Sequence, residues 1–289
     1  MAPTQPLTPL RQRMLDDMKL RNMALSTRKI YVAAVAGFSA YHGRSPDRLT
    51  LEDVRDYQLH LVARGLKATS ICQTMSALRF FYAVTLDRPE EAARIPLPRK
   101  ADPLPAILSR EEVARLLARV ADPKMRTLLT TIYAAGLRVS EAVALQVGDI
   151  DSARMTIHVR EGKGARDRYV MLSPQLLAIL RAHWCRARPR PWLFPGPDPS
   201  RPITTRTVRR ACREAVEVAG LDKSATVHTL RHCFATHLLE QGVDIRVIQG
   251  LLGHRHIAST TRYARVALST ISQVQSPLEL LNLGTPAPA

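Results

Sequence analysis

The sequence is poor in the residues and runs that mark several large classes of protein. Its four cysteines, Cys72, Cys185, Cys212 and Cys233, form no CxxC pair, which argues against a zinc site and predicts free thiols in a reducing compartment. No apolar run approaches the ~18 residues that a membrane-spanning helix needs, and the first residues do not form a signal peptide. We therefore expect a cytoplasmic protein that does not enter a membrane.

Signatures of nucleotide-driven and metal-driven chemistry are also missing. The chain has no GxxxxGK[ST] loop to hold the phosphates of ATP, and no cluster of carboxylates that would bind two Mg²⁺ ions. We therefore expect an activity that uses neither a cofactor nor a metal.

Acidic residues are few, and arginine supplies most of the positive charge. Lys and Arg total 42 against 25 Asp and Glu, which gives a net charge of +17 and a pI near 10.5. This balance favours a polyanionic partner, with nucleic acid as the first candidate and an acidic membrane surface as the rival. Arginine suits bidentate contacts to phosphate, although a GC-rich genome would produce the same excess.

Apolar residues at helical spacing predict a four-helix domain over residues 10–88, after a loose, proline-rich arm over residues 1–9. Dense prolines then favour an extended linker, which places the domain boundary at residues 89–106. The expected first residues or caps of the second, third and fourth helices are Ser26 or Thr27, the capping box opened by Thr50, and Thr69 or Ser70.

A second domain, over residues 107–275, is expected to combine helices with a small antiparallel sheet. Ser109 and Glu112 form an S-x-x-E capping box that opens its first helix. Alternating apolar residues from Met155 predict a strand, and a glycine-rich turn returns the chain as a second strand. Lys163 is therefore expected at the tip of a hairpin.

The stretch from residue 226 to residue 263 concentrates the candidate chemistry. His228 and Arg231 are three residues apart, and so share one face of the helix expected to begin near Thr229. His254 follows, and Tyr263 comes nine residues later.

Capping residues divide this stretch into helices. Asp244 is expected to be the N-cap and Gly253 the C′ residue of the helix that precedes His254. Ser259 or Thr260 is expected to cap a last helix that carries the tyrosine.

The order Arg, Lys, His-x-x-Arg, His, Tyr resembles the signature of the tyrosine recombinases, the phage-integrase family. Residues 135–141 (AGLRVSE) look like its first-arginine motif, and residues 160–168 (REGKGARDR) look like the hairpin that carries its lysine. A single HxxR has little specificity, whereas the ordered set is highly specific, and the resemblance covers nearly the whole chain. The resemblance is greatest to integron-type integrases, which carry a long insertion near residues 181–202 that this chain lacks.

The resemblance implies a mainly α fold with a small antiparallel β-sheet. An N-terminal four-helix, SAM-like core-binding domain and a C-terminal α+β catalytic domain would form a C-shaped clamp on DNA. The implied activity is that of a site-specific recombinase, or integrase, which cuts and rejoins DNA through a covalent 3′-phosphotyrosine intermediate without metal or ATP. The implied partners are double-stranded DNA with inverted-repeat core sites and a homotetramer on two such sites, in the bacterial cytoplasm and nucleoid.

Phosphodiester cleavage requires a nucleophile, charge stabilisation and a proton for the leaving oxygen. Arg138 and Arg231 suit the non-bridging oxygens, and Lys163 can reach the leaving 5′-oxygen as general acid. Tyr263 is the expected nucleophile, because its ester stores the bond that a later 5′-hydroxyl restores. His228 and His254 can hydrogen-bond the phosphate, and the sequence leaves open which of them takes the phenol proton.

Residues outside this set receive supporting roles. By resemblance, Glu141 supports the catalytic groups without acting on the substrate, whereas His232, His237 and His256 are interpreted as structural or surface residues. Basic residues of the first domain and of a helix expected over 204–219 are candidates for DNA contact, although each also suits a solvated surface: Arg28, Lys29, Lys67, Arg79, Arg206, Arg209 and Arg210.

Two alternatives and one assembly hypothesis accompany this interpretation. A type IB topoisomerase would relax DNA with the same pocket, and a basic regulator would bind DNA without catalysis. Within the tail, residues 276–289, the leucine-rich segment 276–283 is expected to dock on a neighbouring subunit, with docking on its own subunit as the alternative.

Overall fold

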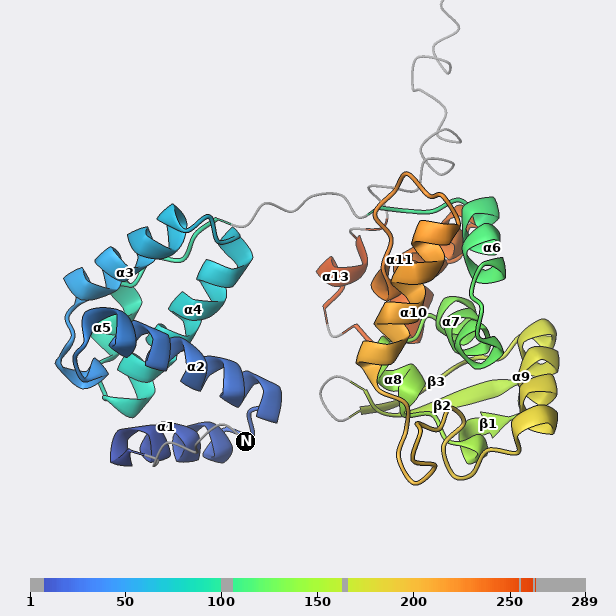
Figure 1. Cartoon of the computed structure of the whole chain (residues 1–289), viewed down its shortest axis with the longest axis horizontal. Helices are drawn as coiled ribbons and strands as arrows, with labels where there is room; N and C mark the ends of the chain where they lie inside the picture. Colours follow the sequence, from blue (N-terminus) through green and yellow to red (C-terminus); the bar gives the residue numbers. More distant parts are fainter. Residues whose placement is uncertain (1–7, 100–105, 163–165, 255, 262, 264–289) are drawn as a thin grey trace, which may run out of the picture. The chain divides into compact units, whose positions relative to one another are not determined.

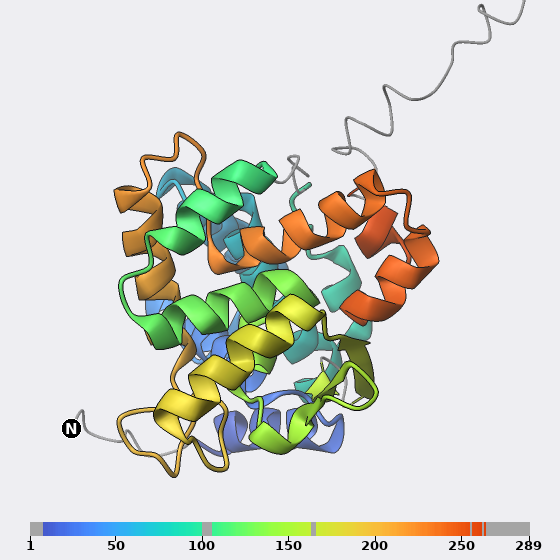
Figure 2. The ribbon, with the colours of Figure 1, turned by 90° about the vertical axis from the view of Figure 1, so that its right-hand side faces the viewer.

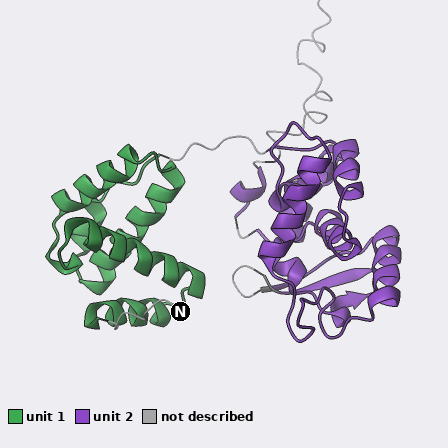
Figure 3. Ribbon diagram, in the orientation of Figure 1, with its two compact units in different colours: residues 1–103 green, residues 104–289 purple. Residues whose placement is uncertain are grey.

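The structure is a computed structural model that describes residues 8–99, 106–162, 166–254, 256–261 and 263. The chain divides into two compact units, residues 1–103 and residues 104–289, each with its own hydrophobic core (Figure 3). Both units are mainly helical (Figure 1). No helix among the described residues is long and apolar enough to cross a membrane.

The first unit is helical throughout its described part. Thr50 and Asp53 form the expected capping box at the start of its third α-helix, with each side chain bonded to the other residue's backbone N–H. The elements are α1 (Pro9–Leu20), α2 (Leu25–His42), η1 (Pro46–Arg48), α3 (Leu51–Ala63), α4 (Ala68–Phe80), the π-helical turn η2 (Phe81–Thr85) and α5 (Pro89–Arg94).

Two helix starts differ from the prediction. Helix α2 begins at Leu25 after Ala24, and α4 begins at Ala68 after Lys67; neither has a side-chain cap. The serines and threonines expected as caps therefore lie inside the first turns. Helix α1 begins at Pro9, inside the predicted arm, because Thr8 caps it and proline suits the first helical position.

The prediction of an extended linker over residues 89–106 is wrong for its first residues, which form α5 (Pro89–Arg94). Pro89 occupies the first position of α5, where its missing N–H costs no hydrogen bond. Ala92 and Ile95 are buried in the core of the first unit. Arg79 of α4 donates from Nε to the Ile95 carbonyl at 2.8 Å, which ties this segment to the unit. The boundary between the units, after Pro103, still lies inside the predicted 89–106 segment.

The second unit combines helices with a three-stranded sheet. The Ser109–Glu112 capping box is present at the start of α6. The elements are α6 (Arg110–Ala118), α7 (Pro123–Ala135), α8 (Val139–Val143), η3 (Val147–Asp149), β1 (Ile150–Asp151), β2 (Thr156–Gly162), β3 (Arg166–Met171), α9 (Pro174–Ala187), α10 (Thr205–Val218), α11 (Val227–Glu240), α12 (Ile245–Leu252) and α13 (Ala258–Thr261).

The sheet is antiparallel throughout, in the order β1-β2-β3. The pairing of β2 with β3 sets His158 opposite Tyr169 and Val159 opposite Arg168. Helix α7 lies between α11 and α9 and packs against both (Figure 2). The turn after α7 is therefore held against α11, and this turn leads directly to Arg138.

Gly136 ends α7 in the left-handed conformation, with φ of 63°. A Cβ at this position would lie 2.4 Å from the Phe234 ring of α11 and 3.3 Å from Leu252 of α12. The close approach of α11 and α12 to this turn therefore requires glycine on two grounds, conformation and space.

Gly136→Ala is expected to lower the free energy of unfolding of the second unit by about 2–4 kcal/mol, through left-handed strain together with overpacking against Phe234. Gly242→Ala is the matched control, because Gly242 has φ of 80° but no heavy atom within 4 Å of the place that a Cβ would take. Urea unfolding followed by tryptophan fluorescence isolates this unit, since Trp184 and Trp192 both belong to it. Equal losses in the two variants would contradict the packing argument.

Candidate active site

One buried carboxylate organises the basic residues of the second unit. Glu141 of α8 accepts hydrogen bonds from Arg138 Nη1 at 2.6 Å, from the Arg138 backbone N–H at 2.8 Å, and from Arg168 at 3.0 and 2.8 Å. Burial would raise the pKa of Glu141, but the hydrogen bonds and charges of Arg168 and Arg138 lower it to about 2. Glu141 is therefore ionised at neutral pH and fixes two arginines.

Arg231 points from α11 into the same cluster and is 1% exposed. Its Nη1 lies 3.6 Å from Glu141 Oε2 and donates to the Gly136 carbonyl at 2.6 Å, while Nη2 donates to the Leu252 carbonyl at 2.6 Å. Burial and the charge of Arg138 lower the pKa of Arg231 to about 10. Its buried Nε has no acceptor within the part of the chain that the structure describes.

His254 lies just beyond α12, as expected, because Asp244 caps that helix and Gly253 ends it in the left-handed conformation. Its Nε2 lies 3.3 Å from Arg231 Nη2, and its Nδ1 lies 2.9 Å from Thr260 Oγ1. Burial and the neighbouring guanidiniums, Arg231 first, lower the pKa of His254 to about 4. This histidine is therefore neutral at physiological pH.

Tyr263 is 2% exposed and lies against this cluster. Its ring stacks with the ring of His254, with centroids 6.4 Å apart. Its hydroxyl lies 3.0 Å from Nδ1 of His232, a residue that the sequence alone presents as structural or surface. The prediction of the last helix is wrong on two points: Ser259 and Thr260 lie inside α13 (Ala258–Thr261) and do not precede it, and Tyr263 lies in a turn.

A cavity of about 700 Å³ opens beside these residues, between α8, α10 and the start of α11. Arg138, Arg209, Arg213 and His228 line it. His228 and Arg231 share a helix but not an environment, since His228 is exposed whereas Arg231 is buried.

The predicted catalytic residues thus converge from α8, α11 and the segment after α12, with one exception. Lys163 belongs to the connection between β2 and β3 and lies outside the described residues. Two contributors were missed, Arg168 on β3 and His232 on α11. In the sequence, only its place in the REGKGARDR motif points to Arg168, and no pattern points to His232.

The candidate DNA-contact residues fall into three groups. Lys29 and Lys67 of the first unit are exposed, and Arg28 is partly buried. Arg79 instead stabilises the first unit, because its guanidinium donates hydrogen bonds to the Ile95 carbonyl at the end of α5. The arginines of α10 are all exposed, namely Arg206, Arg209, Arg210 and Arg213, and of these Arg209 and Arg213 face the cavity.

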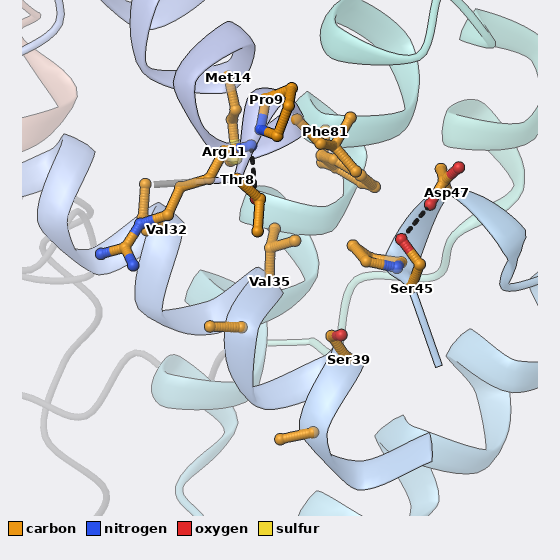
Figure 4. A pocket seen from close by; sticks show the side chains of 14 residues that line it. Thr8, Pro9, Arg11, Met14, Val32, Val35, Ser39, Ser45, Asp47 and Phe81 are labelled. Carbon is orange, nitrogen blue, oxygen red and sulfur yellow. Dashed lines mark hydrogen bonds between the residues drawn. The ribbon is translucent and has the colours of Figure 1, made fainter. Parts of the chain in front are cut away.

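A second cavity, of about 640 Å³, lies within the first unit, between α1, α2 and η1 (Figure 4). Its lining is mainly apolar and includes Met14, Val32, Val35 and Phe81. Because it lacks the grouped guanidiniums and histidines of the other cavity, we do not consider it a catalytic site.

The chain matches two known families. Residues 106–269 match the phage integrase family, and residues 10–91 match the phage integrase N-terminal SAM-like domain. The chain belongs to the phage integrase family of tyrosine recombinases.

Relatives at 50% and 34% identity cover most of this chain. The y4qK protein of Sinorhizobium fredii, of the integrase/recombinase type, is 50% identical over 98% of this chain and 92% of its own. The tyrosine recombinase XerD of Caulobacter vibrioides is 34% identical over 84% of this chain and 86% of its own.

Solved structures support the same fold. The crystal structure of XerA recombinase aligns with a TM-score of 0.53 at 29% identity, and covers 92% of this chain and 99% of its own. XerH bound to a palindromic difH substrate aligns with a TM-score of 0.73 at 21% identity, over 93% of this chain and 85% of its own. The mainly α fold with a SAM-like first domain is thus confirmed for this phage integrase family member.

Glu141→Gln is expected to lower the free energy of unfolding at pH 7 by about 3 kcal/mol, because buried guanidiniums lose their counter-charge. The folded pKa of Glu141, about 2, lies below its ordinary 4.5, so this stabilisation is present above pH 4.5 and is lost as pH falls toward 2. The difference between wild type and variant should therefore shrink from pH 5 to pH 2 in urea unfolding.

The control for this prediction is Glu214→Gln, which alters an exposed pair with Arg210 at 3.6 Å. We expect a change below about 0.5 kcal/mol there. A Glu141 variant as stable as this control at pH 7 would contradict the organising role of the carboxylate.

Proposed function

We propose that this tyrosine recombinase cuts and rejoins double-stranded DNA at specific sites through a covalent bond between Tyr263 and a 3′-phosphate. The observation that carries the proposal is the burial of Tyr263 against a cluster in which three guanidiniums, those of Arg138, Arg168 and Arg231, share the one carboxylate of Glu141. The cluster holds excess positive charge in a place of low dielectric, which suits a phosphodiester and the charge of its transition state.

Arg138 and Arg231 are the proposed phosphate-binding pair. Arg138 is 21% exposed at the edge of the cavity, so its guanidinium can meet substrate while Glu141 holds it. The buried Nε of Arg231 is a donor that a phosphate oxygen would satisfy. His228 at the cavity wall and His254 beside Arg231 are proposed to complete the set of hydrogen-bond donors around the phosphate.

Lys163 is the proposed general acid for the leaving 5′-oxygen. Strand β2 ends at Gly162 and strand β3 begins at Arg166, so the lysine lies in their short connection. Arg168 of β3 donates hydrogen bonds to Glu141 and to the Leu251 carbonyl. These bonds hold the hairpin against the cluster of arginines around Glu141. No step in this scheme needs ATP or a metal ion, because fixed cations stabilise the charge.

The two units are proposed to clamp one duplex, and four chains to join two sites. Exposed basic residues occur on both, such as Lys29 and Lys67 in the first and Arg209 in the second. XerH and lambda integrase have been solved on their DNA sites, which supports a duplex partner for this chain. The tail, residues 276–289, lies outside the described residues, and its docking on a neighbouring subunit remains a prediction.

Tyr263→Phe is expected to abolish covalent attachment to DNA while leaving DNA binding and folding intact, because one hydroxyl is lost and little volume changes. A pool of nicked duplexes with randomised arms, incubated in excess EDTA, removes the need to know the target sequence. Adducts that survive denaturant are recovered and sequenced, and should come from wild type alone. An adduct of equal yield with the Phe variant would exclude Tyr263 as the nucleophile.

Arg209→Ala is expected to weaken duplex binding and to reduce the slope of log affinity against log salt by about 1, because one phosphate contact is lost. Arg210→Ala is the matched control on the same helix, since Arg210 does not line the cavity and is paired with Glu214. The measurement is a gel-shift titration at several salt concentrations. Equal slopes for the two variants would argue against DNA binding along this cavity.

A further inference from the structure

The ring of His232 lies against the hydroxyl of Tyr263. Nδ1 of His232 is 3.0 Å from the phenol oxygen, and the two ring centroids are 5.4 Å apart. His232 follows Arg231 directly on α11, so the helix that carries a phosphate ligand also carries this contact. Under the proposed function, the contact is made with the reacting atom itself.

His254 is poorly arranged to take the phenol proton. Because a guanidinium only donates, Nε2 of His254 accepts from Arg231, which leaves Nδ1–H to donate to Thr260. A second proton on His254 would place a positive charge next to Arg231. The stacked ring also presents its face, rather than a nitrogen, to Tyr263.

The rings of His228, His232 and Tyr263 form a row, and His228 lies at the end beside the cavity. It lies one turn before His232 on α11, and the two rings meet edge to face with centroids 4.3 Å apart. It lines the cavity with Arg138 and Arg209, where the phosphate is proposed to bind. Its position therefore suits a phosphate ligand, with His232 between it and the phenol.

We propose that His232 is the general base of the cleavage step and accepts the Tyr263 proton on Nδ1. The inference rests on the proposed function. In the tautomer that carries its hydrogen on Nε2, Nδ1 accepts a hydrogen bond from the phenol, and 3.0 Å lies within the range required for proton transfer. This nitrogen already contacts the proposed nucleophile in the structure.

Protons and bonds balance across this step. The phenol oxygen forms a bond to phosphorus as its proton moves to His232, and the bond from phosphorus to the 5′-oxygen breaks as Lys163 donates a proton to that oxygen. The products are a 3′-phosphotyrosine, a free 5′-hydroxyl, a cationic His232 and a neutral Lys163. Rejoining reverses each transfer, so that His232 returns its proton to the departing phenol oxygen.

His232→Asn separates proton acceptance from hydrogen bonding, because an amide oxygen can accept from the phenol but cannot remove its proton. We expect single-turnover formation of the covalent adduct to slow by about 100-fold, with unchanged DNA affinity and unfolding midpoint. His256→Asn, at an exposed histidine of the same unit, is the control and should cleave at the wild-type rate. His232→Gln serves as a second amide variant in case the Asn variant folds poorly.

A substrate with sulfur at the 5′-bridging position distinguishes loss of the general base from loss of the general acid. A thiolate leaves without being protonated, so cleavage of this substrate needs no general acid. Lys163→Ala should regain most of its lost rate on this substrate, whereas His232→Asn should not. Free imidazole should in turn restore cleavage by His232→Ala and leave Lys163→Ala unchanged, since it can replace a missing base at the phenol.

The outcomes distinguish failure of the proposed function from failure of the role of His232 alone. If wild type forms no adduct, the proposed function fails and the role of His232 fails with it. If wild type forms an adduct and the two amide variants cleave within about twofold of it, only the role of His232 is overturned. Recovery of His232→Asn on the sulfur substrate would also overturn it, because the defect would then lie at the leaving group.

Discussion

The ion pairs of Glu141 are the interaction on which the rest of the site depends. A single carboxylate, 5% exposed, accepts a side-chain and a backbone hydrogen bond from Arg138 and one bond from each of Nη1 and Nη2 of Arg168. Without it, several guanidiniums would repel one another in a buried place. With it, the arginines keep fixed positions before any substrate arrives, which is the arrangement that electrostatic catalysis requires.

The same carboxylate connects elements that are distant in the sequence. Arg138 is the N-cap of α8, Arg168 lies on β3, and Arg231 comes from α11. Gly136 allows α11 and α12 to approach the turn before Arg138. Gly253 likewise leaves room for Arg168, because a Cβ at Gly253 would lie 3.1 Å from the Arg168 side chain. The two glycines and the carboxylate therefore fix the elements that position His254 and Tyr263. In this way residues spread over more than a hundred positions of the chain form one contact cluster beside the cavity.

The caps of α2 and α4 are not where the sequence predicts them, but the local features that the structure confirms have local causes. The capping boxes at Thr50 and Ser109, the cap at Asp244 and the glycine end of α12 each depend on a few neighbouring residues. The segment after Pro89 was predicted wrongly, because dense proline favours extension although proline is also compatible with the first position of a helix. The burial of Ile95, which is what fixes this segment, is not visible in the sequence.

The candidate catalytic residues follow from an ordered motif, but two of their partners do not. Arg168 and His232 owe their importance to contacts with Glu141 and Tyr263, which lie 27 and 31 residues away in the chain. Neither spacing has a helical or strand period, so no pattern could reveal it. Helix periodicity also gave His228 and Arg231 a common face, whereas packing buries one and exposes the other.

Attachment of DNA to Tyr263 is the central claim of the proposed mechanism. It is tested most directly by mass spectrometry of the denaturant-stable adduct, after digestion of both protein and DNA. We predict a nucleotide joined through its 3′-phosphate to Tyr263, with a free 5′-hydroxyl on the released strand. A nucleotide on any other residue, or one joined through its 5′-phosphate, would contradict this mechanism.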